Sequence, residues 1–169
     1  MYFDGAAHRE GVGAGIVFYT PETNIFPYSF TLTRRCSNNV AKYQALILNF
    51  ETAVDMKQLH FRVYGDSKLV INQLFGIHGV KKLELIPYYK YARQLMGYLD
   101  NVTIEHIPKN FNQQADSLAR VASMITLPSY RNQISICQNW VIPPMFDEED
   151  NGGEKNAYHI FVHEIEKED

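Results

Sequence analysis

The order of strand-like and helix-like segments is the feature that most restricts how this chain can fold. Two runs of β-branched and aromatic residues, 13–20 and 25–32, are separated by the turn sequence PETN, which predicts a β-hairpin. A short strand at 2–4 precedes them, and the glycine-containing run up to Gly13 is predicted to be a loop. The chain is therefore expected to begin with three antiparallel strands.

After these strands, helices alternate with strands. Apolar residues three and four positions apart predict a helix over about 39–57, with Ser37, Asn38 and Asn39 as N-cap candidates. The remaining predicted elements are a half-buried strand from Leu59 to Gly65, a short helix from Ser67 to about Phe75, a helix at 84–99, a strand at 102–107 and a helix at 113–123. This order implies an α/β fold in which helices flank a mixed five-stranded sheet.

The composition suggests one domain at 1–123 followed by an extended, acidic tail at 124–169. At most, Trp140 of this tail is expected to dock onto the domain. Residues 147–169 contain nine Asp and Glu against two Lys, a net charge of −7, and the remaining residues carry +4. A mildly basic body suits a polyanion ligand, although +4 is also ordinary for a solvated surface. No stretch resembles a membrane span or a signal peptide, so an intracellular protein, cytoplasmic or nuclear, is expected.

Three aspartates suggest chemistry. Asp4 falls at the first strand, Asp66 follows a strand and precedes a helix, and Asp116 interrupts an otherwise apolar helix. Any one of them could be a cap or a turn former. Together they suit Mg²⁺ or Mn²⁺, because hard divalent cations take oxygen ligands and metal-assisted phosphodiester hydrolysis needs several carboxylates.

These motifs resemble a known family. The matching segments are YFDGA (2–6), GAGIVFY (13–19), SNNVAKYQAL (37–46), VYGDSKLVINQLFG (63–76) and IEHIPKNFNQQADSLA (104–119). In this order they resemble the type-1 ribonuclease H domain of gypsy-like LTR retrotransposon polyproteins, of the sort abundant in plants. The resemblance implies the ribonuclease H-like fold, metal-dependent cleavage of RNA in RNA–DNA hybrids, and metal binding by Asp4, Asp66 and Asp116.

The chain departs from that pattern at one position. Where the family has a metal-binding Glu, this sequence has Lys42. Gln44 faces away from that position, and Glu51, nine residues further on, lies on the opposite helix face. Lys42 is expected to pair with Asp4 or Asp66 and to compete with the metal; alternatively its stem extends to solvent and leaves a weak three-Asp site.

The resemblance also implies substrate contacts. With the lysines added for their charge, the residues expected to bind substrate are Ser37, Asn38, Asn39, Lys68, Lys81 and Lys82. The first three match positions that touch the minor groove of the hybrid, and the lysines could neutralise phosphates. The alternative for the lysines is a solvated helix surface.

The function expected from the sequence is that of a monomeric RNA–DNA hybrid ribonuclease domain of retroelement origin with impaired catalysis. A non-catalytic domain recruited for nucleic-acid or protein binding is the alternative. A gene fragment under no functional demand is a third possibility.

Overall fold

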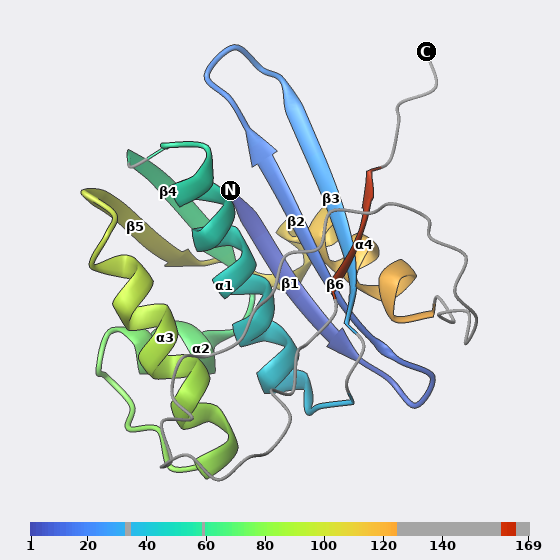
Figure 1. Cartoon of the computed structure of the whole chain (residues 1–169), viewed down its shortest axis with the longest axis vertical. Helices are drawn as coiled ribbons and strands as arrows, with labels where there is room; N and C mark the ends of the chain where they lie inside the picture. The colour runs from blue at the N-terminus through green and yellow to red at the C-terminus, as the bar shows by residue number, and fades with distance from the viewer. Residues whose placement is uncertain (33–34, 59, 125–159, 165–169) are drawn as a thin grey trace, which may run out of the picture.

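The computed structural model describes residues 1–32, 35–58, 60–124 and 160–164 (Figure 1). In chain order, the elements are β1 (Tyr2–Ala7), β2 (Val12–Tyr19), β3 (Ile25–Leu32), α1 (Asn38–Asp55), β4 (His60–Gly65), α2 (Lys68–Leu74), the 3₁₀ turn η1 (Leu83–Leu85), α3 (Ile86–Met96), β5 (Asn101–His106), the 3₁₀ turn η2 (Lys109–Phe111), α4 (Gln113–Met124) and β6 (Ile160–Glu164). None of the described helices has both the length and the apolar character needed to cross a membrane.

The strands form one mixed sheet in the order β5-β4-β1-β2-β3-β6. The β1–β2 and β2–β3 pairs are antiparallel, whereas β4 is parallel to both β1 and β5. Helices α1, α2 and α3 lie on the near face of the sheet in Figure 1, and α4 packs behind β1, β2 and β3. The predicted α/β fold, with five strands flanked by helices, is confirmed.

A sixth strand, β6, was not expected from the sequence. It comes from the predicted tail and pairs antiparallel with β3, from Leu32 opposite Ile160 to Tyr28 opposite Glu164. The segment IFVHE has strand-forming residues, but it is short and lies among acidic residues, a composition that predicts a tail. Trp140 lies outside the described residues, and its predicted docking stays a prediction.

Glycine determines how closely the helices approach the sheet. Strand β1 runs through Ala7, so the loop predicted from Gly5 onward is wrong for its first three residues. A Cβ on Gly5 would lie 2.2 Å from the Ala41 carbonyl carbon of α1, and one on Gly15 would lie 2.2 Å from the Ala115 carbonyl oxygen of α4. Real Cβ atoms do not approach so closely, which explains why glycines stand inside these strands.

Helix α1 supplies the centre of the core. Ser37 caps it by accepting a hydrogen bond from the Val40 N–H at 3.3 Å, as predicted for an N-cap. Its apolar residues Tyr43, Leu46, Ile47, Phe50 and Ala53 are fully buried. This long buried helix is the support from which the polar residues of its first turns reach the sheet.

The opposite side of α1 holds a partly buried carboxyl group, that of Glu51. Tyr91 of α3 donates a hydrogen bond of 2.5 Å to Glu51 Oε1. Burial raises the pKa of Glu51 to about 7, against the opposing effect of this hydrogen bond, and Asp55 adds to the rise. Glu51 therefore faces away from Lys42, as its spacing in the sequence predicted.

Replacing Glu51 with Gln should change how stability depends on pH. Between pH 4.5 and about 7 the folded protein keeps a proton on Glu51 that the unfolded chain has released. The free energy of unfolding therefore falls as pH rises through this window, by at most about 3 kcal/mol. Glu51→Gln should abolish this fall, whereas Glu10→Gln, at an exposed loop residue, should keep it. Urea unfolding from about pH 4.5 to 8 measures the effect, and equal pH dependence in parent and Glu51→Gln would contradict it.

Candidate active site around Lys42

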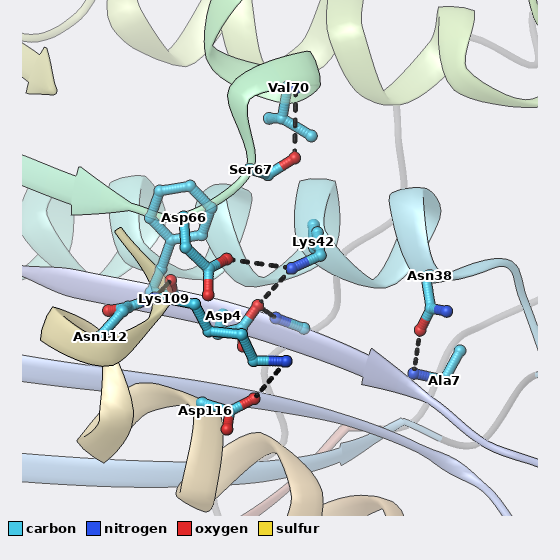
Figure 2. Close-up of polar contacts among 12 residues, drawn as sticks. Asp4, Ala7, Asn38, Lys42, Asp66, Ser67, Val70, Lys109, Asn112 and Asp116 are labelled. Carbon is cyan, nitrogen blue, oxygen red and sulfur yellow. Dashed lines mark hydrogen bonds and ion pairs between the residues drawn. The ribbon is translucent and has the colours of Figure 1, made fainter. Parts of the chain in front are cut away.

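One lysine side chain joins two of the three predicted metal ligands. Lys42 Nζ lies 2.7 Å from Asp4 Oδ1 and 3.1 Å from Asp66 Oδ1 (Figure 2). The two carboxylates are almost fully buried, with 4% and 6% of their side-chain surface exposed, and the lysine is 22% exposed. Of the two outcomes considered from the sequence, pairing is therefore confirmed and extension into solvent is wrong.

The fold fixes all three residues. Asp4 lies in β1, and Asp66 directly follows β4, the strand parallel to β1. Lys42 comes from the second turn of α1, which approaches the sheet closely because Gly5 has no side chain. The N–H of Gly5 also donates to Asp4 Oδ1 at 2.9 Å. The ammonium is thus held by a helix against the interior of β1 and the end of its neighbour β4.

Burial and charge act on this group in opposite directions. Burial raises the pKa of Asp4, and the nearby Asp66 adds to the rise, while the Lys42 ammonium and the Gly5 N–H oppose it. Burial alone would lower the pKa of Lys42, but the two carboxylates outweigh burial and raise it. Lys42 therefore stays protonated across the physiological range. The second oxygen of Asp66, Oδ2, is buried without a hydrogen-bond partner.

Asp116 has different partners. It approaches from α4, on the other side of β1, and its carboxylate points to Lys109 in Figure 2. Arg120 Nη2 lies 3.1 Å from Asp116 Oδ2, and Lys109 Nζ lies 3.9 Å from Oδ1. Helix α4 meets the sheet at Gly15, the cross-strand partner of Asp4. Asp116 is thus brought to the same region of the sheet but not into the Lys42 ion-pair network.

Two of these partners were missed by sequence reasoning. Arg120 follows Asp116 by four residues in a helix, a spacing that predicts an ion pair. Lys109 gave no such signal, because η2 brings it back toward α4 only in the folded chain. The same turn places Asn112, whose buried side chain donates to the Phe3 carbonyl at 2.9 Å and ties the start of α4 to β1.

The predicted substrate-binding residues lie at the start of α1, at the start of α2 and just before η1. Ser37 donates to Glu84 Oε1 at 3.1 Å, and Asn38 Oδ1 accepts from the Ala7 N–H at 2.9 Å, so both have structural partners. Asn38 and Asn39 precede Lys42 by one helical turn and share its face of α1. The three lysines, Lys68, Lys81 and Lys82, are exposed. Contact of these residues with nucleic acid stays a prediction.

The donor set does not suit a divalent ion as it stands. In the described part of the chain, no three His, Cys, Asp or Glu side chains are arranged to hold a metal. The facing oxygens of Asp4 and Asp66 are both taken by an ammonium, which supplies the positive charge that a metal would supply. Mg²⁺ requires several oxygen ligands in near-octahedral geometry. The metal role of Asp4, Asp66 and Asp116 therefore stays a prediction.

Comparison with known proteins agrees with this fold. The family model described as reverse transcriptase-like matches residues 2–122. Ribonuclease HI of Halobacterium salinarum is 35% identical over 123 residues, 72% of this chain and 62% of that protein. The crystal structure of RNase H1 from the same archaeon has a TM-score of 0.67 at 34% identity, covering 72% of this chain and 93% of that one. LC11-RNase H1, isolated from compost and solved in complex with an RNA/DNA hybrid, has a TM-score of 0.65 at 28% identity, covering 72% of this chain and 94% of that one.

These matches define a ribonuclease H-type domain. The chain belongs to the reverse transcriptase-like family, whose model covers residues 2–122. It spans about three fifths of the length of the curated Halobacterium relative.

Removing the ammonium should destabilise the protein. In a Lys42→Met variant, the buried Asp4 and Asp66 carboxylates would face each other without a cation, which should lower the free energy of unfolding by roughly 1–4 kcal/mol. Adding Asp4→Asn should recover part of the loss, because one uncompensated charge is removed. Lys57→Met, at an exposed residue after α1, should change stability by less than about 0.5 kcal/mol. Denaturant unfolding measures all four proteins, and a Lys42→Met variant as stable as the parent would count against the ion pair.

Proposed function

We propose that this chain is an RNA–DNA hybrid-binding ribonuclease H domain of retroelement origin in which hydrolysis is impaired. The observation that carries the proposal is the position of Lys42 Nζ, at 2.7 Å from Asp4 and 3.1 Å from Asp66. Membership of the reverse transcriptase-like family supports the origin. The domain acts as an intracellular monomer in this proposal.

Impaired hydrolysis follows from competition between two cations. Mg²⁺ or Mn²⁺, held by Asp4, Asp66 and Asp116, would activate water and stabilise the leaving oxygen of a phosphodiester. Because Lys42 stands where the family has a Glu, the site lacks a fourth carboxylate. The lysine also holds a positive charge against two of the three ligands. Unit charges about 4 Å apart interact by roughly 4 kcal/mol at an effective dielectric near 20. Metal binding next to this ammonium should therefore be weaker by orders of magnitude.

Binding of the hybrid does not require the metal in this proposal. The relative LC11-RNase H1 was solved with an RNA/DNA hybrid, and this chain keeps Asn38 and Asn39 on the helix face that carries Lys42. The exposed Lys68, Lys81 and Lys82 can neutralise phosphates. The second candidate function is a domain that binds nucleic acid or protein and has no hydrolytic activity. The same ion pair favours it, since an ammonium held at the metal position would abolish hydrolysis.

Restoring the carboxylate should restore the chemistry. The parent should show little or no cleavage of the RNA strand of a labelled hybrid in Mg²⁺ or Mn²⁺, and Lys42→Glu should gain cleavage. The variant adds a like charge to the cluster, so it should be less stable than the parent in chelator and recover when Mg²⁺ is added. Gel analysis of the labelled RNA strand measures the gain.

Two controls separate this outcome from a change in net charge. Lys57→Glu makes the same charge change at an exposed residue beyond α1 and should gain no cleavage. Lys42→Gln removes the competing cation without supplying a carboxylate and should gain less than Lys42→Glu. If the parent already cleaves at a rate that glutamate does not improve, Lys42 does not block the site.

Hybrid binding is tested separately. If blunt hybrid does not bind at low salt, or its affinity is unchanged by salt, the binding part of the proposal is wrong.

A further inference from the structure

A second feature lies on the face of β1 that carries Asp4. An open cavity of about 270 Å³ is bordered by the ends of β1 and β2 and by the turn from η2 into α4. Its lining residues are Tyr2, Tyr19, Asn110, Phe111, Asn112, Gln113, Gln114 and Ala115. This volume is slightly below the usual range for small-ligand sites, which suits one planar heterocycle rather than an extended ligand.

Aromatic rings border this cavity. Tyr2 lies between Tyr64, stacked at a centroid distance of 5.0 Å, and Tyr19, edge-on at 5.3 Å. Phe111 of η2, 70% exposed, also lines the cavity. An exposed Phe ring next to a row of tyrosines is the arrangement on which unpaired bases stack, and such stacking is tolerant of base identity.

Side-chain amides supply polar groups at the same cavity. Tyr19 donates a hydrogen bond to Gln114 Oε1, which fixes the position of that amide. Asn110 and Gln113 are exposed and line the cavity. Amides of this kind pair with the donor and acceptor edges of nucleobases. Lys109, 67% exposed in η2 next to Asn110, offers a positive charge to a neighbouring phosphate.

We propose that this cavity binds one unpaired nucleobase of a single-stranded segment that adjoins the hybrid. The base stacks on Phe111 and the tyrosine row, and the amides of Asn110 and Gln113 contact its edge. Tyr2 and Asp4 point to the same face of β1 because they are two positions apart in the strand, which is about 6.6 Å along it. A nucleic-acid strand at Asp4 can thus continue directly to the cavity. This inference rests on the proposed hybrid binding, and it assigns that site a preference for hybrids with single-stranded extensions.

Affinity for three substrates tests the inference. Fluorescence anisotropy would compare a blunt hybrid, the same hybrid with a single-stranded extension, and one whose extension is abasic, with each strand extended in turn. A base-containing extension should tighten binding roughly 5- to 150-fold over the abasic one. The abasic arm carries the same phosphates, so it removes the electrostatic contribution of the extension.

Variants locate the effect. Phe111→Ala and Gln113→Ala change exposed side chains and should each reduce the gain from the base. Phe26→Ala, at an aromatic residue that is 40% exposed and lies outside the cavity lining, should leave that gain intact. A short single-stranded oligonucleotide should also shift the amide NMR signals of residues 110–115 in the parent.

The outcomes separate the two proposals. Equal affinity for base-containing and abasic extensions, or a gain that survives both cavity variants, would overturn the cavity inference while hybrid binding stands. If blunt hybrid does not bind but the single-stranded oligonucleotide shifts residues 110–115, and Phe111→Ala abolishes those shifts, the cavity binds bases and the proposed hybrid function fails.

Discussion

The ion-pair group formed by Lys42, Asp4 and Asp66 is the interaction on which the account of this protein depends. It joins the first strand, the central helix and the end of the strand parallel to β1. Two buried carboxylates beside each other require a positive charge, and this chain provides it from its own sequence. An ammonium is attached to the backbone, so it cannot leave as a metal ion can, and it offers no Lewis-acid chemistry. The interaction that stabilises this site is therefore also the one expected to impair hydrolysis.

This arrangement depends on how closely the layers pack. Gly5 allows the backbone of α1 to lie against β1, and Gly15 allows the backbone of α4 to lie against the other face of the sheet. Asp4 lies beside both positions, next to Gly5 in sequence and opposite Gly15 in the sheet. Side chains from α1 and from the turn before α4 can thus reach the same strand. The ion pair and the cavity lined by Tyr2 both follow from this close packing.

Much of the fold could be predicted from local patterns. The hairpin of β2 and β3, the buried face of α1 and the Ser37 cap all have signals within a few residues of each other. Strand β1 was predicted too short because glycines inside a strand resemble a loop, and their role emerges only when a helix packs on them. Strand β6 was missed because its pairing with β3 joins segments that are far apart in the sequence.

The candidate site was predictable to a similar extent. The resemblance to the ribonuclease H family identified Lys42 as a neighbour of Asp4 and Asp66, because it assigns all three positions to one site. The Lys109 contact with Asp116 and the cavity around Phe111 were not predictable, because η2 determines both and its conformation depends on tertiary packing. Tyr2 and Tyr64 each stand two positions before an Asp. Their stacking was not predictable from this pattern, because it depends on the pairing of β1 with β4.

Paramagnetic NMR with Mn²⁺ tests the central claim most directly, because a bound Mn²⁺ ion broadens the signals of nuclei near it whether or not any substrate is present. The amide signals of Gly5 and Ser67, which neighbour Asp4 and Asp66 in the sequence, would be followed during a Mn²⁺ titration of the parent and of Lys42→Glu. If Lys42 occupies the cation position, these signals will persist in the parent at Mn²⁺ concentrations that erase them in the variant. Selective loss of the Gly5 and Ser67 signals in the parent, at the same Mn²⁺ concentrations as in Lys42→Glu, would contradict the account.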